Sequence, residues 1–109
     1  MQRLPKQIVA AELAVDAVDL YTAPKNTRAT ISACSVTNKG DATRAFTIGI
    51  RPAGGALRLV ASGMTISPGE TRVVHGVLAQ TIEAGGVLVG SADAAGALDI
   101  VASAYETNP

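Results

Sequence analysis

The side chains best suited to acid–base or nucleophilic chemistry in this 109-residue chain are one histidine, His75, and one cysteine, Cys34. A catalytic histidine needs a nucleophile to deprotonate or a carboxylate to orient it. His75 follows Val74 and precedes Gly76, and no Gly-x-Ser-x-Gly motif accompanies it. We therefore expect a surface or hydrogen-bonding role for His75, and we expect that the protein is not an enzyme.

Cys34 stands in a run of small and β-branched residues that predicts a strand. A buried thiol in such a strand behaves as a small hydrophobe. A reactive thiolate needs neighbouring positive charge or a helix N-terminus, and the residues around Cys34 indicate neither. A single cysteine cannot form a disulfide within its own chain, so an intermolecular disulfide is the alternative role.

No group of residues has the spacing of a metal or phosphate site. A calcium loop needs oxygen ligands at alternate positions over about twelve residues. The glycine pairs at 54–55 and 85–86 lie between predicted strands and open no helix, unlike phosphate-binding loops. We expect no metal and no cofactor, because the acidic residues are scattered along the chain: Asp16, Asp19, Asp93 and Asp99.

Charge and hydropathy exclude two classes of partner. Nine Lys and Arg balance nine Asp and Glu, and aromatic residues make up only 3% of the chain. A nucleic-acid surface uses positive charge and, for single strands, aromatic rings on which bases stack. No apolar run approaches the roughly 20 residues that span a bilayer, and residues 1–6 do not begin a signal peptide. We expect neither a nucleic-acid nor a membrane partner.

The elements that must position these residues are predicted to be strands. Short runs of β-branched and small residues alternate with Gly, Pro, Asn and Asp about every ten residues. This spacing predicts an all-β fold of about eight strands, an antiparallel two-sheet β-sandwich of jelly-roll or immunoglobulin-like type; a small closed barrel is the alternative. Residues 19–109 are expected to form this domain, and residues 1–18 an N-terminal extended arm.

Four strands are expected in the first half of the chain, and the second is the short run Leu20-Tyr21-Thr22, which Pro24 ends. Alternation in residues 9–15 predicts a half-buried strand that turns its odd-numbered residues to one side. Residues 28–37 predict a strand whose apolar phase shifts near Ser32, which indicates either a bulge or burial on both faces. A turn signal at 38–41 separates this strand from an alternating strand at 43–51, and we expect the two to pair as an antiparallel hairpin.

The second half continues the pattern. Residues 57–66 divide into two short runs, and a strand at 71–79 is expected to turn Val73 and Val77 inward. The continuous apolar run at 87–89 is typical of a central strand covered on both sides. The last strand is expected to turn four apolar residues to one face: Leu98, Ile100, Ala102 and Ala104.

The core of this domain is expected to be lean, because 20 of the hydrophobic residues are Ala. A small domain with little bulk inside gains stability when a partner subunit buries a sheet face or an edge strand. We therefore expect a homo-oligomer that also binds other subunits. The candidate interface residues lie in the N-terminal segment and on predicted strands: Leu4, Ile8, Val9, Leu13, Val15, Tyr21, Arg28, Arg44, Arg51 and Tyr105.

A series of turn-and-strand motifs resembles small β-sandwich virion proteins of tailed bacteriophages, over residues of about 20–105. The motifs are Leu20-Tyr21-Thr22-Ala23-Pro24, Arg28-Ala29-Thr30-Ile31, Asn38-Lys39-Gly40 and Arg51-Pro52-Ala53-Gly54-Gly55. The resemblance implies a non-enzymatic structural component of the virion, made in the host bacterial cytoplasm. It implies a head decoration (cement) protein first, and a neck, tail or baseplate accessory protein as the alternative.

Two further expectations concern contacts. The N-terminal arm, from Leu4 to Val18, is expected to add a strand to an adjacent subunit or to lie across the particle surface. A host-surface or glycan-binding module is a further alternative, and it would need aromatic platforms. The chain offers only Tyr21, Phe46 and Tyr105 for that purpose.

Overall fold

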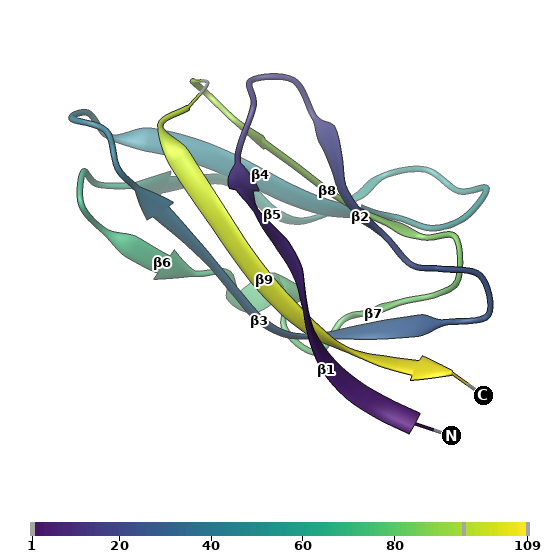
Figure 1. Cartoon of the computed structure of the whole chain (residues 1–109). Coiled ribbons are helices and arrows are strands. Elements are labelled where there is room, and N and C mark those ends of the chain that lie inside the picture. The colour runs from purple at the N-terminus through teal and green to yellow at the C-terminus, as the bar shows by residue number, and fades with distance from the viewer. Residues whose placement is uncertain (1, 95, 109) are drawn as a thin grey trace.

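The structure is a computed structural model that describes residues 2–94 and 96–108, with only the backbone described for residues 2–5 and 108. The regular secondary structure of the described residues is almost entirely β-strand (Figure 1). Their elements, in chain order, are β1 (Gln2–Glu12), β2 (Val18–Thr22), β3 (Arg28–Asn38), β4 (Arg44–Arg51), β5 (Arg58–Ile66), β6 (Thr71–Val73), the 3-10 helix η1 (His75–Val77), β7 (Thr81–Ile82), β8 (Val87–Ala92) and β9 (Leu98–Asn108).

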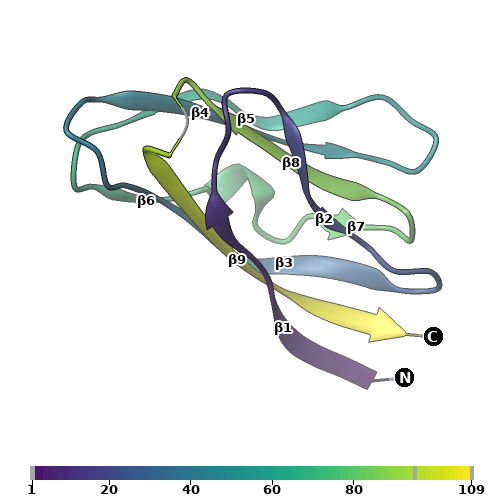
Figure 2. The same cartoon turned by 45° about the horizontal axis from the view of Figure 1, so that its top comes forward.

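The strands form two antiparallel sheets packed face to face. Sheet A has the strand order β1-β9-β3-β6, with β7 also paired to β3, and sheet B has the order β2-β8-β4-β5. In Figure 2 the strands of sheet B lie above those of sheet A. The prediction of an all-β, two-sheet antiparallel sandwich is confirmed, and the barrel alternative is wrong, because the two sheets do not close into one.

The connections give the sandwich jelly-roll topology. The chain crosses between the sheets after β1, β2, β3, β5, β7 and β8, while β4 and β5 are neighbours in sheet B. Counted as two halves of one edge strand, β6 and β7 bring sheet A to four strands. Two interleaved four-stranded sheets of this kind are a jelly roll, whereas immunoglobulin-like sandwiches connect their strands differently.

The predicted hairpin between residues 28–37 and 43–51 is wrong. β3 lies in sheet A and β4 in sheet B, so the turn between them crosses the sandwich. The side chain of Asn38, fully buried, fixes this crossing. Its Nδ2 donates to the carbonyl oxygens of Ala42 at 2.8 Å and Ile66 at 3.0 Å, and its Oδ1 accepts from the Gly40 N–H at 2.9 Å.

The predicted irregularity near Ser32 is confirmed as a β-bulge. The register between β3 and β9 shifts between Ile31 and Ala33. Ile31 and Cys34 are buried on either side of the bulge, while Ser32 and Ala33 are exposed. One extra residue therefore explains the change of apolar phase, as bulges do elsewhere.

A second bulge joins the two short runs predicted in residues 57–66 into one strand, β5. The register against β4 shifts opposite Thr47, where Gly63 has a φ of 59°. The Gly63 N–H donates to Thr47 Oγ1 at 3.1 Å. Only glycine adopts this left-handed conformation without strain, so the bulge falls at the glycine.

The strand predicted at 71–79 is interrupted. Its first three residues form β6, which pairs with β3, and η1 follows; β7, which also pairs with β3, begins at Thr81, beyond the predicted end. Val77 is buried as predicted, but the expectation for Val73 is wrong, because Val73 pairs with Ser35 on the outer side of sheet A. Val74 occupies the core position instead.

The core lies between the sheets. β9 contributes four buried residues on one face, as predicted, and β4 contributes Phe46 and Ile48. β8 lies between β2 and β4, which confirms its central position. The largest fully buried side chains come from both sheets and their connections: Phe46, Leu13, Ile31, Ile48, Ile66, Ile82, Leu88, Leu98, Ile100, Val36, Val74 and Val77.

Most of the segment expected to be an arm lies in the chain's own sheet as the edge strand β1. It pairs with β9 from Gln2 opposite Asn108 to Glu12 opposite Asp99, so both ends of the described chain lie side by side (Figure 1). Val9 and Leu13 are buried, but the alternation predicted for residues 9–15 fails at Ala11 and Val15, which are exposed. β1 ends at Glu12, so the period-2 pattern does not continue to Val15.

Candidate interaction surfaces

The two side chains best suited to chemistry are far from any reactive arrangement. His75 is exposed in η1. Cys34 is only 2% exposed in the middle of β3, and burial raises the pKa of its thiol to about 11. The thiol is therefore protonated near neutral pH and is enclosed by its own core, which leaves the predicted hydrophobic role.

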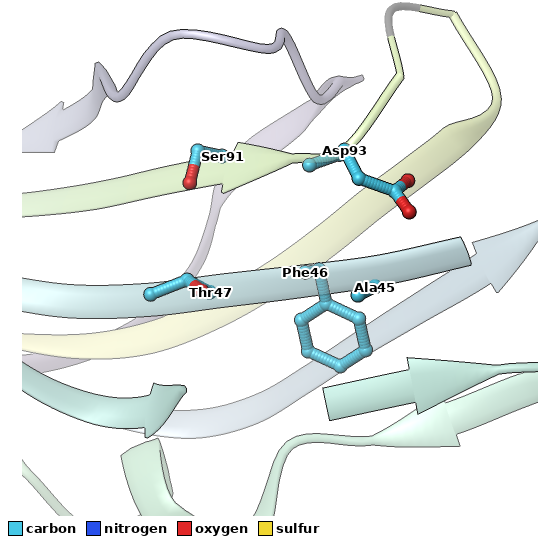
Figure 3. Close-up of a pocket in the computed structure, with 6 residues that line it drawn as sticks. Ala45, Phe46, Thr47, Ser91 and Asp93 are labelled. Carbon is cyan, nitrogen blue, oxygen red and sulfur yellow. The ribbon is translucent and has the colours of Figure 1, made fainter. Parts of the chain in front are cut away.

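The described residues also offer little for a small-molecule or metal site. Among them no three His, Cys, Asp or Glu side chains gather closely enough to hold a metal ion, and no helix is long and apolar enough to cross a bilayer. A hollow of about 200 Å³ lies over β4 and β8, and Figure 3 shows the Asp93 carboxylate apart from the Ser91 hydroxyl. This volume lies below the roughly 300–1,000 Å³ of ordinary ligand pockets.

The N-terminal candidate residues are mostly part of the fold. Val9 and Leu13 belong to the core, and Ile8 is half-buried against it. The backbone of Leu4 pairs with Glu106, and its side chain lies outside the described residues. Among the candidates of this segment with described side chains, only Val15 is largely exposed, at 55%.

The three candidate arginines lie at separate places. Arg51 Nη2 binds Asp19 Oδ2 at 3.0 Å and links β4 to β2. Arg28 Nε binds Glu83 Oε2 at 2.8 Å. Arg44 is half-buried at the start of β4, and in the described structure its buried Nε has no hydrogen-bond partner. The two exposed ion pairs contribute little to stability on their own.

The two candidate tyrosines differ in role. The Tyr21 hydroxyl donates to Glu106 Oε2 at 2.5 Å, and Lys6 Nζ lies 3.5 Å from Glu106 Oε1. This group ties β2 of sheet B to β9 of sheet A. Burial raises the pKa of Tyr21, and Glu106 raises it further. Tyr105 is half-buried opposite Thr30 in sheet A, so it lies away from Tyr21 in the sheet register.

Sequence reasoning missed an apolar cluster on the outer face of sheet B. A Cβ placed on Gly49 would lie 2.9 Å from Leu57 Cδ1 and 3.3 Å from Leu59 Cδ2, so these leucines pack over the sheet there. Val87 and Val89 are buried on the same outer side, apart from the main core. The continuous apolar run at 87–89 was the sequence signal for burial on this outer side. Residues of the same chain, and not a partner, cover the sheet there.

The outer face of sheet A carries a second exposed apolar row. Val101 of β9 and Val73 of β6 both stand opposite Ser35 of β3, and their exposed fractions are 47% and 44%. Ala10 of β1 extends the row beyond Val101. Sequence reasoning placed Val73 in the core and so did not identify this row.

Comparison with known proteins shows likeness of fold alone. No family model matches the sequence, and no curated protein matches it. A chain of the T13 viral particle of infectious bursal disease virus (IBDV) has a TM-score of 0.61 at 10% identity, covering 98% of this chain and 31% of the IBDV chain. A chain of the Gt strain of the same virus has a TM-score of 0.52 at 10% identity, covering 98% and 33%. The protein thus spans about a third of the length of these chains.

Proposed function

We propose that the protein is a non-enzymatic structural component of a virus particle and works by binding other subunits. The observation that supports this most is the likeness of nearly the whole chain to chains of an icosahedral virus particle, with TM-scores of 0.61 and 0.52. Jelly rolls recur in viral capsid domains, where their broad sheet faces and loops meet neighbouring subunits. The fold itself does not fix a function, so the proposal depends on finding the chain in particles.

The finer proposal is a head decoration (cement) protein of a tailed bacteriophage, bound to assembled heads as part of a homo-oligomer. Its support is the resemblance of the turn-and-strand motifs between residues 20 and 105. A neck, tail or baseplate accessory protein is the alternative with the same support. Both place the protein in the virion after synthesis in the host bacterial cytoplasm.

The N-terminal segment of residues 1–18 has a proposed role in contact with a neighbour. In the described part of the chain β1 pairs only with β9, so the other backbone edge of β1 is available to add a strand of another subunit. The segment would then act while it remains in its own sheet. Edge pairing of this kind needs neither Val9 nor Leu13 to leave the core.

Purified particles test the proposed function directly. Particles made by the virus or host cell that encodes this chain are separated on a density gradient, and each fraction is examined by mass spectrometry. We expect the chain to sediment with particles at many copies each and to appear as sandwich-shaped density in cryo-electron microscopy. If the chain is abundant in the cell and absent from washed particles, the proposal is wrong.

Separating heads from tails decides between the two finer proposals. A decoration protein is expected to stay with heads after tails are removed and to rebind to heads from which it has been stripped. A chain that follows the tail fraction would identify the accessory role instead.

A further inference from the structure

We infer that the outer face of sheet A is the surface through which two copies of this chain bind each other, stacked with a two-fold axis. This inference deepens the proposed function and rests on its assembly part, because it names the surface that joins copies into an oligomer.

The centre of the face carries no charge among the described side chains. Three register rows cross it, and among the described residues none of their side chains carries a charge. A sheet face that meets only water ordinarily carries charged side chains. The rows are Ala10, Val101, Ser35 and Val73; Gln7, Ser103 and Ala33; and Tyr105, Thr30 and Thr81.

The hydroxyl groups of this face are already partly satisfied within the chain. Thr30 and Thr81 share a hydrogen bond of 3.2 Å, and Ser32 Oγ donates to the Ser103 carbonyl at 3.2 Å. Removing water from such groups is less unfavourable than removing it from groups without partners. Small side chains also let a second sheet approach to about 10 Å, the spacing of stacked sheets.

Charge is confined to the two ends of the face, with opposite excess. At one end Glu12 and Asp99 surround Lys39, which bonds to both, so one negative charge is in excess. At the other end Arg3 and Arg28 stand on either side of Thr107 in the sheet register. Glu83 pairs with Arg28, so by register position this end of the sheet holds two arginines against one glutamate.

This distribution fits a second copy of the same chain. A two-fold axis near Ser103 places the acidic end of one copy over the basic end of the other, and the Val101 row of each copy over the Tyr105 row of its partner. Stacking in the same direction would instead place like charges together.

The size of the face is also suitable. Three strands of 11 residues and the short β6 and β7 give about 600 Å² per copy, below the ~800 Å² per partner of stable interfaces and of the size of a weak dimer. The outer face of sheet B is a poorer candidate, because Leu57 and Leu59 already cover part of it from within the chain.

Light scattering on the purified full-length chain tests the inference without any particle. We expect a dimer of twice the 11.0 kDa chain mass at concentrations of about 10–100 μM. Val101→Glu is expected to raise the dimer Kd by about 100-fold, because the two-fold axis buries two unpaired carboxylates. Val15→Glu is the matched control, since Val15 is similarly exposed at 55% but lies beyond the end of β1.

Charge reversal tests the two-fold arrangement. Arg28→Glu or Asp99→Arg alone is expected to weaken the dimer about tenfold, and the double variant is expected to recover most of that loss. Circular dichroism and urea unfolding show whether each variant is folded, and Tm values near that of the original chain are expected.

Several results would overturn the inference. The original chain could be monomeric at 100 μM, a concentration at which weak dimers are populated. The Val101→Glu variant could remain dimeric while the Leu59→Glu variant is monomeric, which would assign the interface to sheet B. A double charge reversal no better than the single ones would exclude the two-fold stacking. None of these results bears on whether the chain sediments with particles, so failure here is distinct from failure of the proposed function.

Discussion

Asn38 shows how one polar side chain decides the path of the chain. Its side chain is fully buried and forms hydrogen bonds with Gly40, Ala42 and Ile66. These bonds connect the turn after β3 to the end of β5. A buried amide with all these hydrogen bonds stabilises the crossing, while a buried amide without them would destabilise the fold.

Asn38→Ala is expected to lower the free energy of unfolding by about 2–4 kcal/mol, because it leaves one N–H and two carbonyl groups without their partner. Urea denaturation measures this change. Asn38→Asp retains the acceptor for Gly40 but turns a carboxylate oxygen toward two carbonyl oxygens, so it is expected to be no better than alanine. A change below about 0.5 kcal/mol for both variants would show that the crossing does not depend on Asn38.

The buried thiol of Cys34 makes the stability of the fold depend on pH in the alkaline range. Its thiol has a raised pKa of about 11 in the folded chain against 9.0 in a free thiol, so the folded state binds more protons than the unfolded state between these values. Stability from this group is therefore complete below pH 9 and is lost as pH rises through 11. Cys34→Ala is expected to flatten the fall in stability between pH 9 and 11, measured by urea unfolding at each pH.

The same burial predicts slow labelling. At pH 8 the folded chain is expected to react with a thiol reagent at least about 100-fold more slowly than the urea-unfolded chain, given a two-unit rise in thiol pKa. Rapid labelling of the native protein would mean that Cys34 is accessible and that an intermolecular disulfide is chemically feasible.

Residue-scale prediction from sequence succeeded where alternation was long. In residues 43–51 and 98–104, an apolar side chain recurs at every second position over several residues. This alternation identifies which side chains point into the core. Prediction failed at Val73, because β6 has only three residues and its neighbour Val74 is equally apolar. In so short a strand, the pairing of Val73 with Ser35 determines which side chain points outward. Ser35 is distant in the sequence, so the residues around Val73 do not reveal this pairing.

At the scale of elements, bulges allow long strands to follow the twist of the sandwich. Gly63 illustrates this, because no heavy atom lies within 4 Å of the position that a Cβ would occupy there. The left-handed backbone alone selects the residue. Gly63→Ala is expected to lower stability by about 1–2 kcal/mol through backbone strain.

Gly63→Asn separates strain from packing in that measurement. Asparagine visits the left-handed region more readily than alanine, so it is expected to lower stability less although it is larger. Thermal unfolding of the two variants gives the comparison. The opposite order would mean that space, and not the φ of 59°, restricts this position.

The N-terminal segment gives the second prediction at this scale. Leu13→Ala is expected to lower the free energy of unfolding by about 2–5 kcal/mol, because Leu13 is fully buried in the core. Val15→Ala is the matched control two residues away, and it is expected to change stability by less than about 0.5 kcal/mol. If both variants unfold like the original chain in urea, residues 1–18 form a detachable arm and β1 is dispensable.

Element boundaries were largely predictable, and their sheet assignment was not. Turn residues near positions 24, 40, 68 and 96 mark the ends of strands locally, as Gly, Pro and Asn do in general. The hairpin predicted across residues 38–41 failed because a turn signal is the same whether the chain returns to its neighbour or crosses to the other sheet. For the candidate surfaces, exposed rows such as Val73 and Val101 depend on pairing between distant strands, so sequence reasoning could not assemble them.

As a whole the molecule is a flat slab. Its extents are 45 × 26 × 19 Å, so a large share of its surface lies on the two sheet faces. A thin body of this size leaves much of its surface in water after folding, and it buries more surface when a sheet face is covered.

The adjacency of the chain ends permits a circular permutation. Joining residue 109 to residue 1 through a short Gly/Ser linker and opening the chain at 54–55, in an exposed turn, is expected to give a folded protein with the original circular dichroism spectrum. Opening the chain at Gly90 instead, inside the central strand β8, is expected to abolish folding. A permutant opened at 54–55 that stays unfolded would show that the β1–β9 pairing depends on the order of synthesis.

The pairing of β1 with β9 also means that β1 cannot complete its sheet until β9 has been synthesised. β1 is made well before β9, its only described partner, so Val9 and Leu13 stay without that partner while the intervening strands are synthesised. During that interval the early segment is a site where chaperones can bind or where neighbouring nascent chains can join. Slow translation of the strands between β1 and β9 would therefore lengthen the period of greatest risk of aggregation.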